Sequence, residues 1–112
     1  MSERTDSAEP STSIVELEDD SELDDILELE ATVLVDFYAD WCGPCQLMEG
    51  TVEAVAETVD APVVKVDVDA FPHVAARFDV SSIPTVIGFD QGAPTDRLIG
   101  MQEEKAVRQL IA

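Results

Sequence analysis

The chain has two cysteines, Cys42 and Cys45, which lie in the pentapeptide WCGPC at residues 41–45. A tetrahedral zinc site takes three or four ligands, usually with a second Cys or His pair, and the sequence offers only His73. A purely structural disulfide is a weak alternative, because closing so short a loop removes little entropy from the unfolded chain. The pair is therefore interpreted as a disulfide that opens and closes, with no metal and no other cofactor.

The spacing of the two cysteines suits that chemistry. On the first turn of a helix, residues i and i+3 have Cβ atoms roughly 5–6 Å apart. A disulfide needs about 3.5–4.5 Å, so a small adjustment at the helix start can join the sulfurs. Gly43 permits unusual backbone angles, and Pro44 fixes a helical φ.

The flanking segments predict how the pair is positioned. An apolar run at 33–39 predicts a strand buried on both faces, and apolar residues at helical spacing predict a helix over 42–59. Because free N–H groups at the helix start stabilise a thiolate, we expect an exposed Cys42 to be the nucleophile. Cys45, one turn deeper, is then the resolving thiol. Asp36 is the only carboxylate in the apolar strand, and burial should raise its pKa toward neutrality, where it can exchange protons.

Length and charge restrict the class of protein. With 112 residues the chain is one domain, and its net charge of −19 excludes nucleic acid and anionic membranes as expected partners. Residues 1–30 hold 12 acids and one arginine, and the remaining 82 residues hold 13 acids and five bases. This excess favours a salt-rich cytoplasm over a merely acidic surface. No membrane span and no export signal are recognisable, so we expect a cytoplasmic protein.

The rest of the chain reads as alternating strands and helices. Residues 1–13 are polar and acidic, which predicts a disordered tail, and residues 14–112 form the domain. The expected strands are 14–17 at an edge, 33–39, 63–68, 85–89 and a weak edge strand at 97–99. The first expected helix is capped by Asp20 or Ser21 and has apolar residues up to Leu29. The other expected helices lie at 42–59, after Pro72 and at 103–111.

These marks together resemble the thioredoxin family, over nearly all of the chain from residue 14. The residues that carry the resemblance are Val35-Asp36-Phe37, the WCGPC pentapeptide, Lys65, Ile83-Pro84-Thr85, Gly92 and Gly100. The resemblance implies an α/β fold whose five-stranded mixed sheet has the order 1-3-2-4-5 and is flanked by four helices. It also implies a protein-disulfide reductase, which a thioredoxin reductase or an equivalent donor re-reduces.

The resemblance further assigns site residues. It places Asp36 behind Cys45 as proton acceptor and donor, with Lys65 approaching that acid and tuning it. A cis bond between Ile83 and Pro84 should face the cysteines. The groove for target proteins would be formed by Trp41, Ile83, Pro84, Ile99, Gly100 and Met101.

Four features of the sequence depart from the family pattern. Gly50 replaces a mid-helix proline, Tyr38 a tryptophan, Ser81-Ser82 a more typical basic or glycine-containing approach to the cis-proline, and Met101 a small residue. Ser82 and Met101 bear on target preference, while Gly50 should leave the helix continuous and straighter. We expect a monomer. Two alternatives stay open: a binding subunit or regulator in which turnover is incidental, and a disulfide isomerase or oxidase.

Overall fold

A computed structural model describes residues 14–112, so the predicted tail at 1–13 lies outside the described residues. The strands are β2 (Ile14–Glu16), β3 (Thr32–Tyr38), β4 (Val63–Asp67), β5 (Thr85–Asp90) and β6 (Ala93–Ile99). They form one sheet in the order β2-β4-β3-β5-β6, parallel across β2, β4 and β3 and antiparallel across β3, β5 and β6. In chain order this is 1-3-2-4-5, which confirms the predicted fold.

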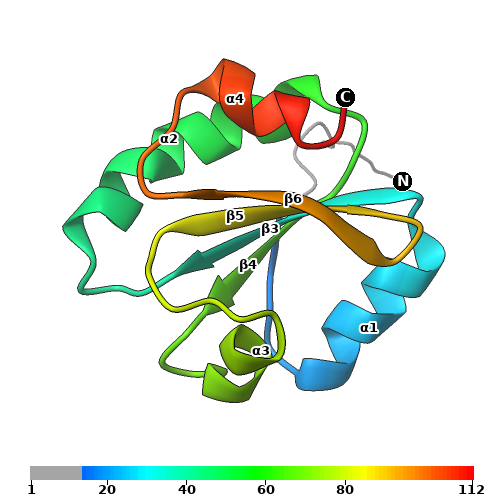
Figure 1. Ribbon diagram of the computed structural model, residues 1–112, viewed down its shortest axis with the longest axis horizontal. Coiled ribbons are helices and arrows are strands. Elements are labelled where there is room, and N and C mark those ends of the chain that lie inside the picture. The colour runs from blue at the N-terminus through cyan, green and yellow to red at the C-terminus, as the bar shows by residue number, and fades with distance from the viewer. Residues whose placement is uncertain (1–13) are drawn as a thin grey trace, which may run out of the picture.

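Helices cover both faces of this sheet (Figure 1). They are α1 (Asp20–Leu29), α2 (Gly43–Thr58), α3 (Pro72–Arg77) and α4 (Glu104–Gln109), with α2 and α4 on one face and α1 and α3 on the other. Side chains alternate along each strand, so β3 contributes to two cores. Val33, Val35 and Phe37 pack toward α1 and α3, whereas Leu34 packs against the residues of α2.

The predicted bounds of α1, β6 and α4 need correction, and those of the other elements, apart from α3, differ by one residue at one or both ends. Helix α1 is capped by Asp19, whose side chain accepts the N–H of Ser21, and Leu29 at its end is 81% exposed rather than buried. Strand β6 begins at Ala93 and includes Pro94, because an edge strand needs no donor on its solvent side. Its exposed polar residues gave no apolar pattern, so only 97–99 was predicted. Helix α4 ends at Gln109.

Helix α2 runs without interruption from Gly43 to Thr58, so the predicted continuous helix is confirmed. Its straightness relative to the family stays a prediction. Gly50 is exposed, and a Cβ built on it would meet no heavy atom within 4 Å. No close packing contact therefore requires glycine at this position, and glycine lowers the helix propensity of α2 here.

We expect Gly50→Ala to raise the free energy of unfolding by about 0.5–1 kcal/mol, since alanine loses less backbone entropy in a helix. Urea denaturation measures this directly. Gly88→Ala is the contrasting variant, because its Cβ would lie 2.7 Å from the carbonyl oxygen of Leu110 and should destabilise. A loss of stability in Gly50→Ala would mean that this position needs glycine for a reason other than space.

Candidate active site

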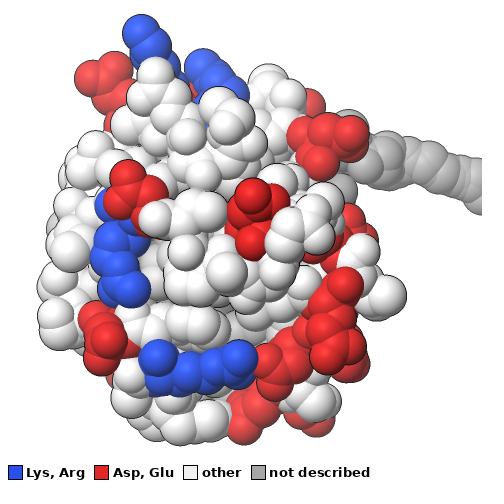
Figure 2. Space-filling model, turned by 45° about the vertical axis from the view of Figure 1, so that its right-hand side comes forward, with Lys and Arg blue, Asp and Glu red and all other residues white. Residues whose placement is uncertain are grey.

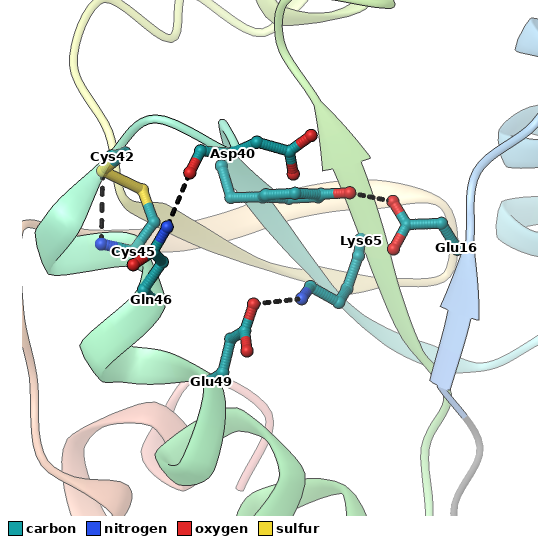
Figure 3. Close-up of polar contacts among 8 residues, drawn as sticks. Glu16, Asp40, Cys42, Cys45, Gln46, Glu49 and Lys65 are labelled. Atoms are coloured by element: carbon teal, nitrogen blue, oxygen red, sulfur yellow. Dashed lines mark hydrogen bonds and ion pairs between the residues drawn. A yellow bond between two sulfur atoms is a disulfide. The ribbon is translucent and has the colours of Figure 1, made fainter.

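Cys42 and Cys45 form a disulfide at the junction of β3 and α2, with their Cα atoms 5.2 Å apart. Cys42 is the N-cap of α2, and its Sγ accepts the backbone N–H of Cys45 at 3.2 Å (Figure 3). The preceding loop is held by Gln46, whose side-chain amide donates to the carbonyl oxygen of Asp40 at 2.7 Å. Pro44 lies in the first turn, where its missing N–H costs nothing. The helix start therefore supplies the N–H groups that stabilise a thiolate on Cys42.

The expected exposure of Cys42 is wrong for this disulfide form. Cys42 is 4% exposed and Cys45 is 5% exposed, because both pack with Ala39, Tyr38, Val68 and Ile83. Exposure thus does not distinguish the two sulfurs. What distinguishes them is the capping position: the Cys42 sulfur accepts the N–H of Cys45.

Asp36 lies in the central strand β3 and is 5% exposed. Its Oδ1 is buried and accepts no hydrogen bond from the described residues. Burial disfavours the charged form and raises the pKa of Asp36 to about 6; Lys65 lowers it, whereas Glu16 and Glu49 raise it further. A carboxyl group with this pKa can both accept and return a proton near neutral pH. The predicted burial of this acid and the direction of its pKa shift are confirmed.

Lys65 is the register partner of Asp36 in the parallel β3–β4 pair, so the two residues are neighbours. Lys65 lowers the pKa of Asp36, as its predicted approach implies, but the ion pair that the Lys65 ammonium makes among the described residues is with Glu49 of α2 at 3.8 Å. The same ammonium lies 4.5 Å from the ring centroid of Tyr38. The Tyr38 hydroxyl in turn donates a hydrogen bond to the Glu16 carboxylate. Glu49 and Glu16 were absent from the sequence prediction.

Of the residues predicted for a target groove, Ile83 packs against the two cysteines. The Ile83–Pro84 peptide bond is cis, as the resemblance implied. The carbonyl oxygen of Pro84 accepts the N–H of Gly100 at 2.8 Å, which joins the loop after β6 to the segment before β5. Gly100 has φ +87°, a conformation that a side chain would strain. Ile99 and Met101, its two neighbours, are exposed.

A hollow of about 200 Å³ lies beside these residues. Its lining consists of Trp41, Val68, Ala75, Val80, Ser81, Ser82 and Ile83. Trp41 is 70% exposed, and its indole N–H donates to Asp69 at 2.7 Å, which fixes the ring at the edge of the hollow. Asp69 is a contact that sequence reasoning missed, although a polar residue just after a buried strand is a usable signal. His73, the only histidine considered as a metal ligand, is exposed and contacts Asp20 on the α1–α3 side.

Comparison with known proteins identifies the family. The sequence profile of the family described as Thioredoxin matches residues 13–112. The chain belongs to the thioredoxin family. Thioredoxin of Staphylococcus saprophyticus is 42% identical over 94 residues, 82% of this chain and 89% of that protein. A thioredoxin of Chlamydia muridarum is 43% identical over 81 residues, 71% of this chain and 79% of the relative.

Solved thioredoxin structures agree with the fold. A mutant thioredoxin from Halobacterium salinarum superposes with a TM-score of 0.85 at 41% identity, covering 93% of this chain and 91% of that one. A thioredoxin from Schistosoma mansoni gives a TM-score of 0.81 at 33% identity, covering 90% and 97%.

Membership and the Cys42–Cys45 disulfide make this chain a thiol–disulfide oxidoreductase. Neither the binding-subunit alternative nor the isomerase or oxidase alternative is favoured. Among the described residues, no helix is both long and apolar enough to cross a bilayer.

Proposed function

We propose that the chain reduces disulfides in other proteins through the Cys42–Cys45 dithiol. The observation that supports this most is the disulfide at the N-terminus of α2, beside the cis Ile83–Pro84 bond and an exposed apolar groove. The reducing direction is favoured by Gly43-Pro44 between the cysteines, which resembles the reducing branch of the family. No other cofactor is needed, because the two sulfurs carry both electrons.

The first step joins the chain to its target. The Cys42 thiolate attacks one sulfur of the target disulfide, so that a Cys42–target bond forms and the target S–S bond breaks. The first target sulfur leaves as a thiolate and takes a proton. The target backbone lies along Pro84 and Gly100, between Trp41 and the exposed side chains of Ile99 and Met101. Met101 and Ser82 then bear on which targets bind.

The second step releases the target. Asp36 accepts the proton of Cys45, and the Cys45 thiolate attacks the Cys42 sulfur. The Cys42–Cys45 disulfide forms, the mixed disulfide breaks, and the second target sulfur leaves and is protonated. The target thus gains two electrons and two protons, and the chain is left in the oxidised form described above. A thioredoxin reductase or an equivalent donor returns the two electrons.

The protein is proposed to work in the cytoplasm as a monomer, on disulfide-containing target proteins. The test is reduction of insulin with dithiothreitol as electron donor, followed as turbidity from the released chains. The protein should accelerate the reaction at catalytic concentration. An acceleration no greater than that of a Cys42→Ser/Cys45→Ser variant would contradict disulfide reduction.

The acidic surface is proposed to be an adaptation to a salt-rich cytoplasm. Figure 2 shows acidic side chains gathered in groups on the face in view, with fewer basic ones between them. With a net charge of −19, like-charge repulsion should destabilise the compact state in dilute buffer. The similarity in sequence and structure to a thioredoxin from Halobacterium salinarum favours this proposal.

We expect the melting temperature to rise by several degrees between about 20 mM and molar potassium chloride, because salt screens this repulsion. Differential scanning calorimetry over a salt series measures it. A neutral solute such as glucose at matched osmolality serves as the control for general osmotic effects. A melting temperature that is flat with salt would leave the acidic surface without an adaptive role.

A further inference from the structure

The face of the sheet beneath α2 holds a set of charged residues beyond the cysteine pair. Glu16, Asp36 and Lys65 occupy adjacent strands at matched register positions, since Glu16 pairs with Lys65 and Lys65 with Asp36. Asp36 lies two positions after Leu34 on β3, and Lys65 two positions after Val63 on β4, so each shares a sheet face with that apolar residue. Leu34 and Val63 pack against α2, so this is the face that α2 covers. A single cation thus lies between carboxylates of two neighbouring strands.

Helix α2 adds a third carboxylate to this cation. Glu49 lies one turn after Cys45 and extends from α2 toward β4, where its Oε2 lies 3.8 Å from the Lys65 ammonium (Figure 3). The lysine side chain is only 14% exposed, so it is more confined than an ordinary surface lysine. The Tyr38 ring covers the ammonium at 4.5 Å, and the Tyr38 hydroxyl is engaged by Glu16. These contacts fix where the ammonium lies.

Asp36 has no ion-pair partner among the described residues, although the Lys65 ammonium lies on the neighbouring strand. Its buried Oδ1 accepts no hydrogen bond from the described residues, while the ammonium beside it pairs with Glu49. A buried carboxylate without a partner is costly, whereas one that pairs with an ammonium is held in its charged form. Burial is the main reason that Asp36 keeps its proton, and the position of Lys65 sets how strongly that effect is opposed.

We propose that Glu49 is a positioning residue, which holds the Lys65 ammonium toward α2 and so leaves Asp36 able to take the proton of Cys45 and return it. This inference rests on the proposed role of Asp36 in disulfide exchange. Glu49 touches no reacting atom and acts through Lys65. The negative charge of Glu49 also raises the pKa of Asp36 directly. Holding Lys65 away from Asp36 and this direct repulsion therefore both favour the protonated carboxyl.

The groups around Asp36 come from every neighbouring element. Strand β4 supplies Lys65, strand β2 supplies Glu16, and α2 supplies Glu49. Strand β3 itself supplies Tyr38, and the β5 partner of Asp36 is the uncharged Val86. Burial has raised the pKa of Tyr38, so the phenol stays neutral while Asp36 titrates. Lys65 is thus the one cation among these described neighbours, and Glu49 is the acid that binds it directly.

The test is an NMR titration of the Asp36 side-chain carboxyl carbon in the oxidised protein, at fixed salt. Glu49→Gln should move the Asp36 midpoint to lower pH by about 0.5 unit, because the freed ammonium can approach Asp36. Glu53→Gln is the matched control: it removes the same charge from the exposed side of α2 one turn further on, and should leave the midpoint unchanged. Equal shifts in the two variants, no shift, or a shift to higher pH in Glu49→Gln would overturn the proposal.

A double-variant cycle separates positioning from direct charge. Lys65→Met should raise the Asp36 midpoint, and adding Glu49→Gln to that background should produce a clearly smaller shift than it does in the wild type. An unchanged shift would mean that Glu49 acts only as a charge, which overturns its positioning role.

Rates of mixed-disulfide resolution, followed against pH, complete the test. In Glu49→Gln their midpoint should move with the NMR midpoint, and a Glu49→Asp variant should restore much of the wild-type profile. If the NMR midpoints shift as expected while insulin reduction is absent in the wild type, the proposed function fails and the positioning of Lys65 stands. If reduction is intact and Glu49→Gln leaves the NMR midpoint unmoved, the positioning fails alone.

Discussion

A Cys45→Ser variant should accumulate a covalent complex with a target protein, whereas a Cys42→Ser variant should form none and lose all measurable reduction of insulin. The reason is the capping geometry at the start of α2. The Cys42 sulfur accepts a backbone N–H there, so its thiolate is stabilised in the reduced protein. Without Cys45 the mixed disulfide has no internal thiol to resolve it.

The complex is detected by non-reducing electrophoresis after mixing each variant with oxidised insulin. Dithiothreitol should release it, and a Cys42→Ser/Cys45→Ser variant provides the background. Because the two cysteines are almost equally buried in the disulfide form, exposure does not predict which one reacts. If Cys42→Ser traps the target and Cys45→Ser does not, the roles are reversed and the helix-terminus argument is wrong for this chain.

Asp36→Asn should form the mixed disulfide at the normal rate and resolve it about 10²-fold more slowly at pH 7, since asparagine cannot accept the proton of Cys45. Stopped-flow measurement of tryptophan fluorescence follows the two phases, because Trp41 borders the disulfide. Glu53→Gln, on the exposed side of α2, is the control. Equal slowing of both phases would point to a disturbed site rather than a lost base.

The same variant should be more stable than the wild type above pH 6. The folded pKa of Asp36 is about 6 against an ordinary value of 3.8, so the folded state binds this proton more tightly. Its contribution to stability is therefore fully present below about pH 4 and is lost as pH rises through 6. The difference of about two units corresponds to about 3 kcal/mol at pH 8 as an upper bound, since a buried amide has its own cost.

Urea denaturation of wild type and Asp36→Asn at pH 8 and pH 4.5 measures this directly. The advantage of the variant should shrink at the lower pH, where the wild-type carboxyl is protonated. An advantage that does not change with pH would show that Asp36 is not titrating in the folded protein in this range.

Sequence reasoning succeeded where a local pattern decides the structure. The apolar run of β3 and the helical spacing after Pro44 place the cysteine pair at a strand-to-helix junction, and both elements are present. The burial of Asp36 followed from the same run. The strand order and the cis bond came from the resemblance, because neither spacing nor propensity specifies which strands pair.

The rest depended on packing between distant segments. The sequence pattern predicts that Glu49 is a solvent-exposed residue of the helix. It contacts Lys65 only because α2 packs over β4. Trp41 and Asp69 are 28 positions apart and meet only after β4 is paired with β3. The burial of Cys42 depends on Val68 and Ile83, which come from separate loops. Contacts of this kind leave no periodic signal in the sequence.

The reduction potential of the Cys42–Cys45 disulfide tests the proposed reductase most directly. It is measured by equilibrating the protein with glutathione buffers and counting free thiols by mass spectrometry after alkylation. A protein-disulfide reductase of this family should give a value near −270 mV, so the pair should be fully reduced only in strongly reducing mixtures. A value above roughly −200 mV would contradict the proposal and assign the chain to the oxidase or isomerase class.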